Sequence, residues 1–171
     1  MINAILMISN DKWTFFKIIG DYNTDIKTLY DAWSTSHGIE KWFLRTADFY
    51  RSEKKIASEQ HVNAGDTYQW FWHGWDDSVF EKGMILEANG IDFIKITFTG
   101  GCIVSVSLTI RDEITMITLT QENIPEEDDP QKSLFVQCQT GWTFYLTNLK
   151  SVIEGGLDLR NKRLDLSSNF K

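Results

Sequence analysis

The chain has 171 residues, of which 42% are hydrophobic and 13% aromatic, and its formal net charge is −7. This length suits one domain with a single core, which we expect to bury roughly 70% of the surface that the unfolded chain exposes. Non-specific binding to nucleic acid or to an anionic membrane needs clustered Lys and Arg, so the negative charge argues against both kinds of partner.

The two cysteines, Cys102 and Cys138, each fall in an apolar, periodic segment. Two cysteines without a CxxC pair make no disulfide framework, and free cysteine is usually buried, so we interpret both as small core residues. The first eleven residues are apolar, but they lack a basic n-region and are too short to span a membrane. We therefore expect a cytoplasmic protein without membrane insertion.

The first part of the chain predicts one strand and two short helices. Lys12–Gly20 is rich in aromatic and β-branched residues, which is typical of a strand. Asn23 or Thr24 can cap a helix whose apolar residues recur at helical spacing, namely Ile26, Leu29, Tyr30 and Trp33. A second helix follows, capped by Thr35 or Ser36, with an apolar side made of Ile39, Trp42 and Phe43.

The middle of the chain, residues 45–122, changes to a hydrophobic period of two. Turn-forming sequences separate six expected strands, which are Thr46–Arg51, Thr67–His73, Val79–Ala88, Phe93–Thr99, Ile103–Ile110 and Thr115–Glu122. Asn89-Gly90, between two apolar runs, is a strong hairpin signal. Apolar and polar residues alternate along residues 94–99 and 104–109, so we predict an antiparallel meander with one apolar face and one solvated face.

The last part of the chain predicts a long amphipathic helix. Asp129 is placed to cap it, Pro130 suits its first position, and Gly155 follows Glu154 as a C-terminal stop. Its apolar stripe consists of Leu134, Phe135, Cys138, Trp142, Tyr145, Leu146, Leu149, Val152 and Ile153. Gly141 costs about 1 kcal/mol relative to Ala in a helix, so we interpret it as allowing close backbone approach or a large neighbouring ring.

The sheet and the long helix can bury their apolar surfaces only against each other. We therefore predict an α+β fold in which a curved antiparallel sheet of about seven strands wraps around the C-terminal helix. The sequence after Gly156 has weak periodicity, and residues 157–171 are expected to fray. We see no linker or repeat, so the whole chain, residues 1–171, is interpreted as a single domain.

Four stretches occur in a characteristic order, namely "TLYDAWSTSHGIEKWF" (28–43), "AGDTYQWFWHG" (64–74), "GMILEANGIDFIKITF" (83–98) and "GWTFYLTNLKSVIEGGLDLRN" (141–161). Together they resemble the helix-grip (START-like, SRPBCC) superfamily, and within it the homologues of the C-terminal domain of the activator of heat shock protein 90 ATPase. The resemblance covers about residues 12–161. It departs at "NAGD" (63–66), where the family often has two adjacent glycines.

The resemblance implies a cavity between helix and sheet, which in relatives binds lipids, sterols, polyketides or other apolar molecules. Five aromatic residues are the candidate lining: Tyr68, Trp70 and Trp72 from the sheet, and Trp142 and Tyr145 from the helix. The alternative is that these rings fill the core. If the strand presents its other face to the cavity, Gln69, Phe71 and His73 line it instead.

Two other functions stay open at this point. The family name implies a chaperone partner, and a cyclase or dehydratase would use the same cavity with a polar group in it. His73 and Glu81, on neighbouring strands, are the weak candidates for acid–base catalysis, although a solvated pair near a turn explains them equally well. His37 and His61 are isolated, and with no HxxxH motif or Cys partner we expect no metal site and no cofactor.

Overall fold

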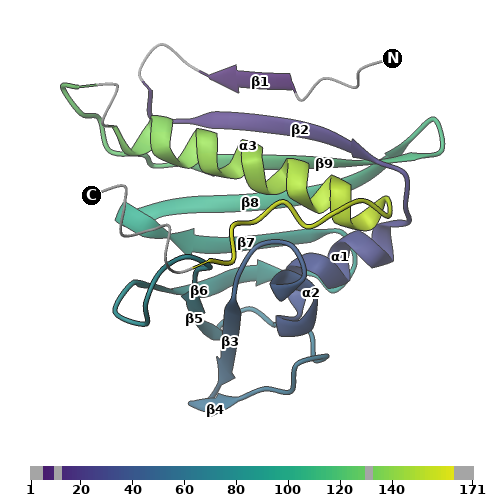
Figure 1. The fold of residues 1–171 in the computed structure, drawn as a ribbon, viewed down its shortest axis with the longest axis horizontal. Helices are drawn as coiled ribbons and strands as arrows, with labels where there is room; N and C mark the ends of the chain where they lie inside the picture. Colours follow the sequence, from purple (N-terminus) through teal and green to yellow (C-terminus); the bar gives the residue numbers. More distant parts are fainter. Residues whose placement is uncertain (1–5, 10–12, 130–132, 164–171) are drawn as a thin grey trace.

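The computed structural model describes residues 6–9, 13–129 and 133–163 (Figure 1). It contains nine strands and three α-helices, with one short 3₁₀ turn, Thr99–Gly101, before β8. The strands are β1 (Leu6–Ser9), β2 (Phe16–Tyr22), β3 (Thr46–Arg51), β4 (Lys54–Lys55), β5 (Thr67–Phe71), β6 (Phe80–Ala88), β7 (Phe93–Phe98), β8 (Cys102–Arg111) and β9 (Ile114–Glu122). The helices are α1 (Ile26–Ser34), α2 (Ser36–Glu40) and α3 (Leu134–Ile153).

All nine strands join one antiparallel sheet, in the order β1-β2-β9-β8-β7-β6-β5-β3-β4. The seven strands expected from the sequence are confirmed, with ends that differ by a few residues. The two additional strands are short and lie at the sheet edges. β4 is only an exposed pair of lysines, and β1 lies in the apolar start of the chain, so neither shows a period-two pattern of useful length.

The two faces of the sheet follow the alternation along each strand. On β8, the buried residues Cys102, Val104, Val106 and Leu108 alternate with less buried neighbours. Ile94 and Ile96 on β7 point to the same interior. Helix α3 lies across this inner face, and α1 and α2 cover its other end (Figure 1). The predicted helix-grip architecture is therefore confirmed.

Two of the helix starts differ from those expected. Asp25, rather than Asn23 or Thr24, caps α1, since its carboxylate accepts from the Thr28 backbone N–H at 2.6 Å. Thr35 caps α2 as one of the two expected residues. Ser133 caps α3, so the expected cap at Asp129 was wrong, and Pro130 lies outside the described residues. Serine and aspartate are both strong N-cap residues, so the sequence offered more than one candidate for this helix start.

The end of α3 agrees with the sequence. The helix ends at Ile153, Glu154 is its C-cap, and Gly155 adopts a positive φ of 82°. Glycine accepts this conformation without the steric cost that a Cβ would bring. Within the described part of the chain, no helix is long and apolar enough to cross a membrane.

Candidate functional site

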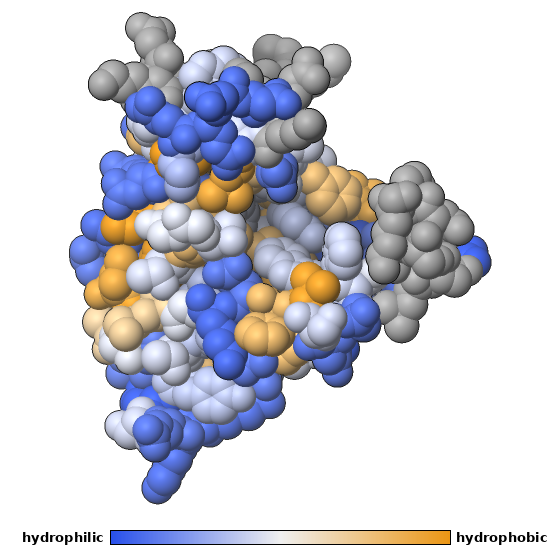
Figure 2. Space-filling model, turned by 90° about the vertical axis from the view of Figure 1, so that its left-hand side faces the viewer, coloured by the Kyte–Doolittle hydropathy of each residue, from blue (hydrophilic) through white to orange (hydrophobic). Residues whose placement is uncertain are grey.

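A groove of about 240 Å³ lies between the first half of α3 and one end of the sheet. On the helix side it is lined by Leu134, Gln137, Cys138, Gly141, Trp142 and Tyr145. Phe43, Trp72, Phe98 and Thr99 form the opposite side. Figure 2 looks at this end of the molecule, where apolar and pale side chains are exposed between hydrophilic ones.

Gly141 keeps the groove open. A Cβ atom added at this position would have nothing within 4 Å outside the helix's own nearby backbone. The expectation that Gly141 allows close backbone approach or makes room for a large ring was therefore wrong. The glycine instead faces open space, and any larger side chain there would project into the groove.

Aromatic rings form the walls of the groove and contact one another closely. Phe43 meets Tyr145 edge to face with 4.7 Å between ring centroids, and it meets Trp72 in the same way at 5.0 Å. Trp142 lies 5.3 Å from Phe98 on the other side. Such rings offer large flat surfaces to an apolar ligand.

Trp142 is held in place by a hydrogen bond from below the groove. Its Nε1 donates to Oε1 of Gln121 at 2.8 Å, and both side chains are buried. Gln121 follows Ile117 and Leu119 at a spacing of two on β9. This spacing of two is the signal in the sequence that places Gln121 on the inward face.

A few polar groups lie in or beside this apolar groove. Thr99 and Gln137 line it directly. Glu81 lies next to Thr99 and is half-buried, and burial raises the pKa of its carboxyl group, against a smaller lowering effect of the hydrogen bond with Thr99. Burial also raises the pKa of the Cys138 thiol to about 11, so this groove-lining cysteine stays protonated at neutral pH.

The five predicted lining residues divide into two groups. Trp72, Trp142 and Tyr145 line the groove. Tyr68 and Trp70 also face inward, but they are not among the residues that line this groove, and they stack on each other with 3.9 Å between ring centroids. They fill the core, so the two readings of the sequence, a cavity and a filled core, each describe part of the interior.

The inward position of Tyr68 and Trp70 excludes the alternative lining by Gln69, Phe71 and His73. Tyr68 reaches across Gly83 on the neighbouring strand, and its hydroxyl donates to the Thr97 carbonyl at 2.6 Å. A residue with a side chain at Gly83 would overlap this ring. The face of β5 was undetermined in the sequence because aromatic residues occupy both sides of the strand.

His73 and Glu81 lie in different surroundings. Glu81 is opposite Trp70 in the strand register and shares its inward face. His73 lies beyond the end of β5, where burial first, and then the positive charges of Arg160 and Lys162, lower the pKa of its imidazole. The strand register does not place the two residues opposite each other, and an acid–base role for them stays a prediction.

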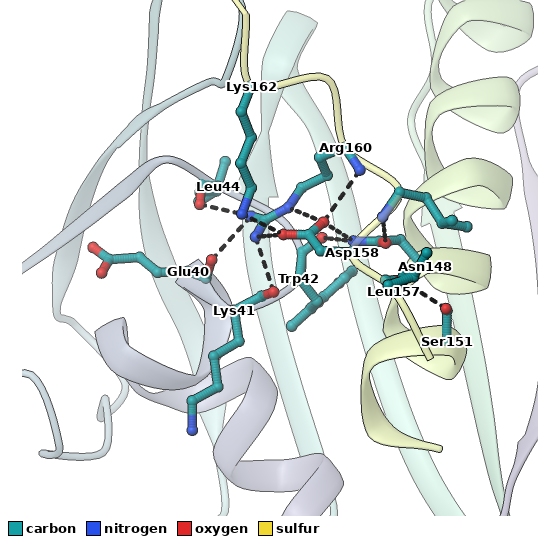
Figure 3. A network of polar contacts seen from close by, with 11 residues as sticks. Glu40, Lys41, Trp42, Leu44, Asn148, Ser151, Leu157, Asp158, Arg160 and Lys162 are labelled. Atoms are coloured by element: carbon teal, nitrogen blue, oxygen red, sulfur yellow. Dashed lines mark hydrogen bonds and ion pairs between the residues drawn. The ribbon is translucent and has the colours of Figure 1, made fainter. Parts of the chain in front are cut away.

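A polar network that the sequence analysis missed holds the turn that carries Phe43 (Figure 3). The Arg160 side chain is 5% exposed and forms a two-pronged ion pair with Asp158 at 2.8 and 2.6 Å. It also donates to three carbonyl groups, those of Glu40 and Lys41 at the end of α2 and that of Leu44 after the following turn, each at 2.9 Å. The first two carbonyls end a helix and lack helical partners, so the guanidinium satisfies them.

Asn148 connects this network to α3. Its Nδ2 donates to the Trp42 carbonyl at 2.7 Å, and its Oδ1 accepts from the Leu159 backbone N–H at 2.6 Å. The segment that follows α3 is therefore fixed along residues 158–160 against both α2 and α3. As a result, the backbone on either side of Phe43 has a defined position at the edge of the groove. The expectation that the chain frays from residue 157 was wrong for residues 158–160. Residues 164–171 lie outside the described residues.

A larger hollow, of about 400 Å³, lies between α1, α2 and the last turns of α3. Its rim carries polar side chains that pair with one another, such as the ion pair of Lys27 with Asp31 at 2.5 Å and the imidazole of His37 with the Glu59 carboxylate at 3.5 Å. Ligand sites combine an apolar lining with a few polar groups. The groove beside Gly141 fits this description better, so we take it as the candidate site.

An antiparallel sheet curved around a C-terminal helix, with an apolar groove between them, defines the helix-grip class of proteins. The sequence matches the family described as "Activator of Hsp90 ATPase homolog 1-like protein" over residues 23–154. The chain therefore belongs to this family. No curated protein matches the sequence.

Solved structures share the fold at low sequence identity. The Aha1 dimer from Colwellia psychrerythraea is similar with a TM-score of 0.62 and 17% identity, over 83% of this chain and 97% of that one. An HSP90 activator from Plasmodium falciparum is similar with a TM-score of 0.61 and 19% identity, over 83% of this chain and 96% of that one. DynU16, from the dynemicin biosynthetic locus, is similar with a TM-score of 0.64 and 16% identity, over 87% of this chain and 50% of that one.

Proposed function

We propose that the protein binds a small apolar or amphipathic molecule in the groove between α3 and the sheet. The observation that supports this most directly is the open space over Gly141, bounded by Trp72, Trp142 and Tyr145. Its volume of about 240 Å³ suits a compact ligand or one end of a longer one. A cytoplasmic location is part of the same proposal.

The polar groups beside the groove favour an amphipathic ligand over a purely apolar one. Thr99 and Gln137 offer a hydroxyl and an amide at its surface, and the Glu81 carboxyl is hydrogen-bonded with Thr99. In apolar pockets a small number of such groups fixes the orientation of the ligand. The aromatic walls supply the contact area.

Substitutions at Gly141 test the proposal with a matched pair. Gly141→Leu places a branched side chain in the groove, whereas Gly141→Ala adds one methyl group that contacts nothing outside the helix. Freshly purified wild type and both variants are compared by native and denaturing mass spectrometry. We expect a releasable small molecule on wild type and Gly141→Ala that is absent from Gly141→Leu.

If the proteins purify without a ligand, the same variants are titrated with 1-anilinonaphthalene-8-sulfonate. Binding should be retained in Gly141→Ala and lost in Gly141→Leu, with circular dichroism showing that both are folded. Equal binding to all three proteins would contradict the assignment of the groove.

A protein-binding role is the second candidate, supported by a separate surface. Trp75 and Phe80, at the β5–β6 turn, are 52% and 45% exposed, and Val79 and Met84 lie near them in the chain and are also exposed. Exposed apolar groups of this kind often mark contact sites. The family name suggests a chaperone ATPase as the partner.

The two candidates separate in one assay. We would measure the ATPase rate of a purified heat shock protein 90 with the wild type, with a Trp75→Ser/Phe80→Ser variant and with Gly141→Leu. Stimulation that the surface variant loses and the groove variant keeps would support the protein-binding role. No stimulation by the wild type would contradict it.

A further inference from the structure

A small cavity of about 10 Å³ lies among core side chains. Seven of its nine lining side chains are apolar residues without a hydrogen-bonding group: Ile39, Phe49, Ile85, Ile94, Ile96, Val104 and Val106. The remaining two are Trp33 and Trp70. The cavity is therefore apolar except for two indole rings.

Both of these indoles carry an unpaired donor. Trp33 and Trp70 are 3% and 1% exposed, and neither Nε1 atom has a hydrogen-bond partner among the described residues. The adjacent buried tryptophans are paired: Trp42 donates to the Ala32 carbonyl and Trp142 donates to Gln121, each at 2.8 Å. Buried polar groups are nearly always paired, and both unpaired donors belong to side chains that line this cavity, which makes it the place to look for their acceptor.

The size and chemistry of the cavity restrict this acceptor. A volume of about 10 Å³ corresponds to a single water-sized group, about one oxygen atom. The lining side chains include no cation, and burying an unpaired carboxylate among apolar groups is strongly unfavourable. A neutral oxygen, such as that of a ketone, aldehyde or amide, fits both donors.

One layer of aromatic rings separates this cavity from the groove. Phe43 and Trp142 line the groove, and their ring centroids lie 5.0 Å apart. On the cavity side, the ring centroid of Phe43 is 5.7 Å from that of Trp70, and the ring centroid of Trp142 is 5.7 Å from that of Trp33. A ligand group that passes this layer would meet both unpaired indoles.

The Phe43 ring is 1% exposed and packs against five other aromatic rings, so entry through this layer requires that ring to rotate. Trp142 is fixed by its hydrogen bond to Gln121, whereas the Phe43 side chain has no polar group to anchor it. Arg160 holds the backbone on both sides of Phe43 through the carbonyls of Lys41 and Leu44. A change of the Phe43 rotamer can therefore open the layer without unfolding the turn.

We propose that the ligand of the groove is an amphipathic molecule with a neutral oxygen acceptor at its inner end, which displaces the Phe43 ring and accepts hydrogen bonds from Trp33 and Trp70. This inference rests on the proposed ligand-binding function. It adds an inner subsite and the chemical class that the subsite selects.

The indole N–H signals of the seven tryptophans test this directly. In ¹H–¹⁵N spectra, assigned with single Trp→Phe variants, the wild type is titrated with 2-acetylnaphthalene and with 2-isopropenylnaphthalene. These probes have the same shape, but only the first carries a carbonyl oxygen. We expect both to shift the signals of Trp72 and Trp142, and only the ketone to shift those of Trp33 and Trp70 downfield.

A Trp33→Phe/Trp70→Phe variant provides the second measurement, with the exposed Trp75→Phe as its control. The wild type and the control should bind the ketone about tenfold more tightly than the hydrocarbon, as one to two hydrogen bonds would give, and the double variant should lose this preference. If the double variant does not fold, the wild-type spectra alone decide the question.

The outcomes separate the two proposals. Shifts of Trp72 and Trp142 with either probe, without a ketone-specific response of Trp33 and Trp70, would overturn the inner subsite and leave the groove intact. That result would mean that the two indoles donate hydrogen bonds only to an internal water molecule. If neither probe shifts any indole signal, the ligand-binding proposal for the groove fails as well.

Discussion

The indole of Trp142 on α3 and the amide of Gln121 on β9 form a buried hydrogen bond of 2.8 Å beneath the groove. The bond joins the helix to β9 and sets the angle of the indole ring that faces the ligand space. It also fixes the inner wall of the groove while the Phe43 wall opposite carries no such bond.

Replacing Gln121 with Met should therefore destabilise the protein. The substitution keeps the volume and leaves the Trp142 N–H buried without an acceptor, which costs about 1–3 kcal/mol. Urea unfolding measures this change. Trp142→Phe removes the donor of the same bond. The losses of unfolding free energy in the two single variants should therefore add up to clearly more than the loss in the double variant. Strict additivity would show that the bond does not couple the two residues.

The Gly141→Ala substitution should stabilise the fold by about 1 kcal/mol. Alanine has the higher helix propensity, and the added methyl group meets no other part of the protein. The thermal midpoint should rise accordingly. Gly83→Ala is the opposing control, because its methyl group would overlap the Tyr68 ring and lower the midpoint. A loss of stability in Gly141→Ala would mean that the space is occupied.

The Asp158→Asn substitution should destabilise the protein at neutral pH. The hydrogen bonds from Arg160, the largest effect, hold the pKa of Asp158 below its usual range. A lowered pKa means stability that is present above the unfolded-state value of about 3.9 and is lost as the pH falls through the folded-state value. The Arg160 side chain is 5% exposed, so removing its counter-charge should cost about 3 kcal/mol.

Urea unfolding of wild type and Asp158→Asn at pH 7 and pH 3 would measure this. The difference in the free energy of unfolding between wild type and Asp158→Asn should be smaller at pH 3 than at pH 7. Asp77→Asn is the control, because Asp77 pairs with Arg45 at the surface with 78% of its side chain exposed. Surface pairs contribute little, so this variant should resemble wild type. Equal effects of the two substitutions would contradict the structural role of Asp158.

The Glu81→Gln substitution should stabilise the protein at neutral pH, whereas Asp158→Asn destabilises it. Burial raises the pKa of this carboxyl group, so the folded state binds its proton more tightly than the unfolded state does. Stability from this residue is therefore complete below the unfolded-state pKa of about 4.3 and falls as the pH rises through the folded-state value. Gln should stabilise the protein at pH 7, and the gain should vanish near pH 4. A gain that persists at pH 4 would argue against this mechanism.

Local patterns in the sequence determined most of the fold. Alternation along residues 94–99 and 104–109 set the two faces of the sheet, and Asn89-Gly90 marked a real hairpin. The apolar stripe of the last helix, with Gly155 after it, predicted a helix that crosses the sheet. These signals depend on neighbouring residues, and the geometry of strands, turns and helices converts them directly into structure.

The shape of the groove could not be predicted from the sequence, because its walls are positioned by contacts between residues that are far apart in the chain. Arg160 reaches the Leu44 carbonyl across 116 positions, and Asn148 reaches the Trp42 carbonyl across 106. No local pattern encodes such pairs, because only the folded chain brings unsatisfied carbonyls and their donors together. The same holds for Gly141, since a glycine in a helix looks alike whether it faces a neighbour or open space. The sequence by itself determined the architecture and supplied the aromatic rings, and the tertiary structure decided which of them fill the core and which leave room for a ligand.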